Sequence, residues 1–96
     1  MKIKNAKTPS PLQTSLLRVE RAMGRIYCLI EITVFDNTVY CISIHEDEFS
    51  CELVGEDALE AQRLFEIVCD EGVVPYQLFD IVSDCKREKI MRISQN

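Results

Sequence analysis

Apolar and polar side chains alternate along residues 26–34, and this alternation constrains the fold more than any other feature of the sequence. Glu31 and Thr33 lie between apolar residues that recur at every second position. Successive side chains of a β-strand point to opposite faces of the sheet, so the alternation predicts a strand with one face against the core. The residues of this isoleucine face are Ile26, Cys28, Ile30, Ile32 and Val34.

The segment from Thr38 to Glu46 is predicted to pair with that strand. A three-residue loop, Phe35-Asp36-Asn37 with Asn37 left-handed, would pair Val34 with Thr38. This register places Tyr40, Ile42 and Ile44 on the isoleucine face. A two-residue turn would instead place Cys41, Ser43 and His45 there, and less apolar surface would be buried. We therefore predict the three-residue loop.

A third strand and two amphipathic helices follow. Phe49, Cys51 and Leu53 alternate with polar residues, which indicates an antiparallel strand with one solvated face. The first helix opens after Gly55 and ends at Gly72, and the second begins at Pro75. Their predicted inward stripes are Ala61, Leu64, Phe65 and Val68, and Leu78, Phe79, Val82 and Cys85. The prediction is an α+β fold, a three-stranded antiparallel β-meander packed on a C-terminal helix hairpin, with an N-terminal helix or extra strand.

Residues 11–23 allow two interpretations. A helix is indicated by a capping-box pattern at its start and by the helical spacing of Leu12, Leu16, Val19 and Met23. A strand is indicated by the alternation of Leu17, Val19 and Arg21, followed by a turn at Met23-Gly24. The helix is slightly favoured, and both alternatives stay open at this point.

Charge is segregated along the chain, whose net charge is −5. Residues 1–25 carry a net +5, residues 26–84 a net −13 and residues 85–96 a net +3. We divide the chain into a basic N-terminal segment (1–24), a single α+β domain (25–88) and a basic C-terminal tail (89–96). The acidic body repels phosphate, so nucleic-acid binding would rest on the basic ends alone, which argues against it. These ends contribute Lys2, Lys4, Lys7 and the stretch from Lys86 to Arg92.

Composition favours a cytoplasmic protein without a membrane association. No stretch approaches the about 20 apolar residues of a membrane span, and the basic start of the chain lacks the apolar core of a secretory signal. Five cysteines, an odd number with no CxxC pair, fit a reducing compartment in which cysteine serves as a small hydrophobic residue.

No group of residues is spaced for catalysis or for binding a metal or a cofactor. The only histidine, His45, lies about 13 Å along the strand from Cys41, so the two cannot hold one ion. Cys41 is the one cysteine expected to be exposed, but Glu31 and Thr33, its expected neighbours, supply no positive charge to activate a thiol. We therefore predict no catalytic residue, no metal and no cofactor, and an enzyme is not favoured.

Two strings carry a resemblance to a known family. They are Val39-Tyr40-Cys41-Ile42-Ser43-Ile44 and Val73-Val74-Pro75-Tyr76-Gln77-Leu78-Phe79-Asp80-Ile81-Val82-Ser83-Asp84. Through them the chain, from about Arg25 to Asp84, resembles a family of small uncharacterised proteins from anaerobic Gram-positive bacteria (Clostridia), catalogued as a domain of unknown function. The resemblance implies a bacterial source and this architecture, and it implies no activity.

The sheet face turned away from the helices is expected to be partly apolar, as interaction surfaces often are. Its candidate interface residues are Tyr27, Leu29, Val39, Cys41 and His45. We expect the N-terminal segment or a second copy of the chain, in a homodimer, to cover it. The hypothesis is a non-enzymatic protein-interaction or regulatory domain. The alternatives are a small thiol-dependent enzyme or sensor that uses Cys41, and weak nucleic-acid binding through the basic tails.

Overall fold

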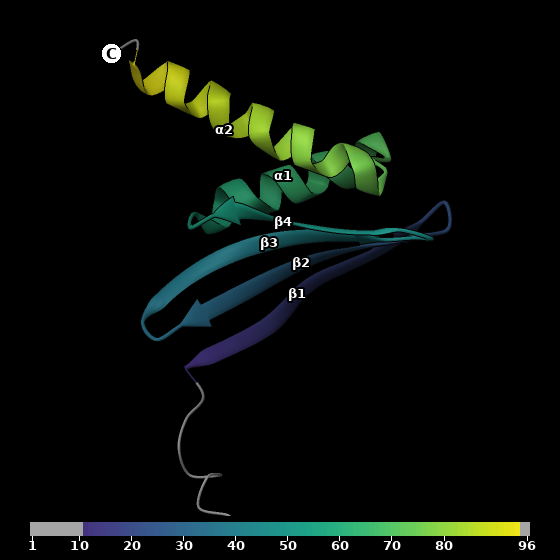
Figure 1. Ribbon diagram of the computed structural model, residues 1–96, viewed down its shortest axis with the longest axis horizontal. Coiled ribbons are helices and arrows are strands. Elements are labelled where there is room, and N and C mark those ends of the chain that lie inside the picture. Colours follow the sequence, from purple (N-terminus) through teal and green to yellow (C-terminus); the bar gives the residue numbers. More distant parts are fainter. Residues whose placement is uncertain (1–10, 95–96) are drawn as a thin grey trace, which may run out of the picture.

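Four antiparallel strands form one sheet, in which the strands neighbour each other in chain order (Figure 1). The computed structural model describes residues 11–94, and the side chains of residues 11–87. The strands are β1 (Leu12–Ala22), β2 (Arg25–Val34), β3 (Asn37–His45) and β4 (Phe49–Gly55). The predicted α+β class and the meander are confirmed, but the sheet has four strands instead of three.

The additional strand is β1, so the slightly favoured helix over residues 11–23 was wrong and the alternative of an extra strand that turns at Met23-Gly24 is confirmed. It pairs with β2 along its whole length, from Leu12 opposite Val34 to Ala22 opposite Arg25, with a bulge between Leu16 and Arg18. Met23 and Gly24 form the connecting turn with positive φ angles of 53° and 76°, as in the type I′ turns that suit two-residue hairpins. Residues 12–22 therefore belong to the sheet, and the remainder of the predicted basic N-terminal segment, residues 1–10, lies outside the described residues.

The turn between β2 and β3 has two residues, not the three that we predicted. Val34 pairs with Asn37, and Phe35 rather than Asn37 takes the positive φ, at 56°. Because side chains alternate with period two, this register turns β2 over relative to the prediction. Tyr27 and Leu29 face the helices, and the isoleucine face points away from them. The predicted set on β3 is correct, since Tyr40, Ile42 and Ile44 do face the helices.

Two helices cover one side of the sheet (Figure 1). Helix α1 (Ala58–Glu71) has the N-cap Asp57, whose carboxylate accepts hydrogen bonds from the backbone N–H groups of Leu59 and Glu60, and it ends at left-handed Gly72. Its predicted stripe is confirmed as buried. A 3₁₀ turn, η2 (Pro75–Gln77), leads into α2 (Leu78–Ser94), which diverges from α1 as it passes over β4.

The beginning of α2 differs from the prediction. Leu78 and Val82 are buried as expected, but Phe79 is exposed. The 3₁₀ turn has three residues per turn instead of 3.6, and this changes the direction of the side chains that follow Pro75. Helix α2 also extends to Ser94, so most of the predicted C-terminal tail is helical.

The core lies between the sheet and the helices, and polar contacts connect the two layers. The Tyr27 hydroxyl donates a hydrogen bond to the Val73 carbonyl at 2.9 Å, which ties β2 to the link between α1 and α2. Arg25 donates to the Gly72 carbonyl at 3.3 Å and forms an ion pair with Glu46 at 3.0 Å. The buried apolar residues of the core are Tyr27, Leu29, Tyr40, Ile42, Ile44, Ala61, Leu64, Phe65, Val68, Val73, Leu78 and Val82.

Replacement of Phe35 by glycine is expected to stabilise the fold. Phe35 is 75% exposed and holds a positive φ, so little apolar burial is lost when the ring is removed. A left-handed conformation costs a residue other than glycine about 1–2 kcal/mol, of which glycine's greater chain entropy cancels roughly half, so Phe35→Gly should raise the free energy of unfolding by about 0.5–1 kcal/mol. Urea unfolding at one fixed protein concentration measures this change. Phe35→Ala keeps the strained φ and should bring no gain; an equal gain in both variants would contradict the explanation.

Candidate interaction surface

The side of the sheet opposite the helices is apolar over all four strands. Within residues 11–94, no helix or strand lies against this side (Figure 1). We call it the open face. The pairing registers place on it Leu12, Thr14, Leu16, Val19, Arg21, Ile26, Cys28, Ile30, Ile32, Val34, Val39, Cys41, Ser43, His45, Phe49, Cys51 and Leu53. Arg21 is the only one of these residues with a full charge at neutral pH.

Cross-strand rows show how the open face is built. Leu16, Ile30, Cys41 and Leu53 are paired in turn from β1 to β4, and they form one apolar row across the whole sheet. The next row consists of Val19, Cys28, Ser43 and Cys51. The large exposed side chains of the two rows are Leu16 and Val19 on β1 and Leu53 on β4, while Cys41 and Ser43 of β3 are small and buried. The open face is therefore lower at Cys41 and Ser43 than at these residues of the edge strands.

Arg18 fixes the orientation of β1 relative to the helices. Its guanidinium carbon lies 5.2 Å from the centre of the Phe65 ring on α1, and its Nη1 lies 3.6 Å from a carboxylate oxygen of Glu66. The bulge beside Arg18 allows this side chain to reach the helix side while Leu16 and Val19 remain on the other side. The apolar residues of β1 therefore extend the open face.

The aromatic pair at one end of the open face contains the only histidine. The ring centres of His45 and Phe49 lie 4.7 Å apart, and the Nε2 atom of His45 is 3.1 Å from the Ser43 hydroxyl. Ser43 is almost completely buried, so this hydrogen bond satisfies a polar group within an apolar surface. His45 thus contributes to the packing of the open face.

The five predicted interface residues separate into two groups. Val39, Cys41 and His45 lie on the predicted side of the sheet, but the Cys41 side chain, which was predicted to be exposed, is buried. Tyr27 and Leu29 are completely buried on the helix side, so they do not form part of an exposed surface. The predicted three-residue loop explains this difference, because it assigned the wrong face of β2 to the outside. The prediction did not include Leu16 and Leu53 among the interface residues. Both belong to alternating segments of the sequence, but the side of the sheet on which they lie follows only from the register.

Cys28, Cys41 and Cys51 gather near the middle of the open face, and the environment of Cys41 and Cys51 opposes thiol reactivity. Burial raises the pKa of the Cys41 thiol, and the neighbouring Cys51 raises it further. Burial also raises the pKa of Cys51. A reactive cysteine requires a lowered pKa, so the environment of these thiols is that of small packing residues.

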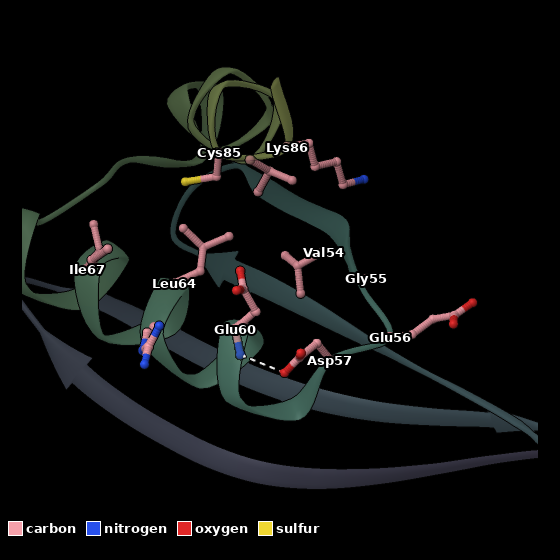
Figure 2. Close-up of a pocket in the computed structure, with 11 residues that line it drawn as sticks. Val54, Gly55, Glu56, Asp57, Glu60, Leu64, Ile67, Cys85 and Lys86 are labelled. Carbon is pink, nitrogen blue, oxygen red and sulfur yellow. Dashed lines mark hydrogen bonds between the residues drawn. The ribbon is translucent and has the colours of Figure 1, made fainter. Parts of the chain in front are cut away.

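A cleft of about 250 Å³ lies between α1, the end of β4 and α2 (Figure 2). Leu64, Val82 and Cys85 form its apolar part, and Glu60 and Lys86 lie at its margin. Asp57 also lines the cleft, but its carboxylate is engaged in capping α1. The polar groups do not converge on one point, so the cleft lacks the arrangement of a catalytic site.

The described part of the chain offers neither a metal site nor a membrane-spanning helix. Among these residues, no three His, Cys, Asp or Glu side chains are placed to hold one metal ion. No helix there is long and apolar enough to cross a membrane.

Slow alkylation of Cys69 and Cys41 is expected. Burial, with a smaller effect of Glu20, raises the pKa of Cys69 to about 11, so about one thiol in ten thousand is ionised at pH 7. Since the thiolate is the nucleophile, the Cys69 rate should rise about tenfold per pH unit up to about pH 10. Cys41 should react more slowly in the folded chain than in urea, because its thiol is buried and its pKa is raised. Iodoacetamide labelling with peptide mass spectrometry measures both rates; faster labelling of Cys41 in the folded chain would support the sensor alternative.

The comparisons with known proteins assign no family to this arrangement. No family model matches the chain, and no curated protein or solved structure matches it.

Proposed function

We propose that this chain is a non-enzymatic protein-interaction domain and that the open face is its binding surface. The observation that carries the proposal is the apolar character of both sides of β2. Tyr27 and Leu29 pack under the helices, while Ile30 and Ile32 lie on the side that no described element covers. Strands with two apolar faces are typical of sheets that are covered on both sides. A partner would supply the second cover.

The charge distribution supports the same surface. On the strands, Glu20, Glu31 and Glu52 all lie on the helix side, and the acidic corner of Glu46 to Glu48 lies beyond the end of β3. An interface core is typically depleted of charged residues and surrounded by polar ones. The open face has this composition, whereas the helix side is strongly charged.

The two alternative functions have less support. A thiol enzyme or sensor would need an activated cysteine, and the pKa of Cys41 is raised. Nucleic-acid binding would depend on the basic ends, of which residues 1–10 lie outside the described residues. The five cysteines are free, which fits the reducing cytoplasm that we propose as the location of the protein.

Dye binding tests whether the open face is accessible in a single folded chain. At submicromolar protein concentration, the wild-type chain should enhance the fluorescence of an anilinonaphthalene sulfonate dye, because this dye binds exposed apolar surface. Phe49→Gln removes one of the largest exposed side chains of the open face and should lower the signal by about half.

Phe79→Gln is the matched control, because Phe49 is 63% exposed on the open face and Phe79 is 60% exposed on α2. This variant should change the dye signal much less. A folded wild-type chain that gives no dye signal at any dilution would refute the proposal, since the open face would then be covered within one chain.

A further inference from the structure

We propose that the partner on the open face is a second copy of this chain, packed face to face across a two-fold axis. The inference rests on the proposed function, because it identifies the occupant of the same surface. In the resulting dimer, two four-stranded sheets form the inner layers and the helices form the outer layers. Packing of two antiparallel sheets about 10 Å apart is one of the standard ways to bury a sheet face.

Charge favours a second copy over a charged partner. A two-fold interface brings the same surface together with itself, so any charge on that surface meets a like charge near the axis. The open face carries no acidic residue and one arginine, Arg21, which lies near the end of β1. Face-to-face packing also directs the acidic helix sides of the two copies away from each other. A basic partner would instead be attracted to the helix side.

The raised and low regions of the open face allow two copies of it to fit together. Leu53 and Phe49 project from β4, whereas Cys41 and Ser43 form a low centre along β3. Two aligned sheets cross at about 30°, so raised side chains of one copy can enter the low region of the other. Alternation of large and small residues across facing positions is what allows two layers to interdigitate.

The available area agrees with a stable dimer. The exposed apolar side chains of the open face, with the half-buried ones between them, offer roughly 600 Å² per chain, close to the about 800 Å² that each partner contributes to a standard interface. In a dimer, each of the two copies supplies this area from its own open face. Within the sequence of residues 1–10, Met1 and Ile3 are the only large apolar residues.

Light scattering after size-exclusion chromatography tests the inference on the full chain. The wild-type protein should have about twice the monomer mass of 11.1 kDa at micromolar concentration. Leu53→Glu places a carboxylate on the open face, beside Cys41, and should raise the dissociation constant at least about 100-fold. Leu59→Glu is the matched control: Leu59 is 67% exposed on α1 and Leu53 is 48% exposed, and both variants have the same net charge.

Thiol protection gives a second readout that needs no substitution. Cys51 is exposed on the open face, whereas Cys69 lies on α1. The labelling rate of Cys51 at alkaline pH should fall as protein concentration rises through the dissociation constant, while the rate of Cys69 stays constant. Equal concentration dependence of both thiols would overturn the inference.

The outcomes separate this inference from the proposed function. A wild-type monomer at all concentrations that binds the dye strongly would overturn the second copy and leave the open face as a site for a different protein. A monomer that does not bind the dye would overturn both proposals. A dimer that both folded variants preserve equally would place the contact elsewhere on the chain and would also overturn the inference.

Discussion

The two-residue turn at Phe35-Asp36 decides which side of the central strands becomes the core. Because side chains alternate with period two, a shift of one residue in the pairing of β2 with β3 would exchange the two faces of β2. With Val34 opposite Asn37, the larger side chains of Tyr27 and Leu29 meet Ile42 and Ile44 under the helices. The smaller side chains of Cys28 and Cys41 are left on the open face. The core, the apolar character of the open face and its low centre therefore all follow from one turn.

Polar contacts reinforce this choice, because they exist in only one register. The Tyr27 hydroxyl reaches the Val73 carbonyl only when Tyr27 faces the helices, and the bond gives the buried hydroxyl a partner. Arg25 lies on the same face of β2 and reaches both the Gly72 carbonyl and Glu46. The link between α1 and α2 is therefore held by β2. Exchange of the two faces of β2 would remove all of these contacts together.

Local patterns of the sequence predict the helices and strands. The register of β2 with β3 depends instead on which face of β2 is buried, and both of its faces are nearly equally apolar. The buried residues of helix α1 and its end at Gly72 were both predicted correctly. Helical periodicity and caps depend on residues that are only a few positions apart in the sequence. In β2 both faces are apolar, so periodicity alone cannot say which one is inside. The turn also lacked its usual signal, since Phe35 takes a positive φ that glycine or asparagine normally holds. The prediction maximised the apolar surface buried on the isoleucine face, but the structure buries Tyr27, whose hydroxyl gains a partner there.

The same exchange of faces changes the role that is inferred for Cys41. A prediction that made Cys41 the one exposed cysteine of a partly apolar face made it a candidate for thiol chemistry. In the structure it lies beside Cys51 and opposite Ile30, in an uncharged surface where burial raises its pKa. Cysteine is a small, weakly polar residue that packs well, and small residues at the centre of a sheet face leave room for side chains from an opposing layer. Covering by a second sheet would withdraw these thiols further from water, so the feature that suggested catalysis is better explained by packing between two copies.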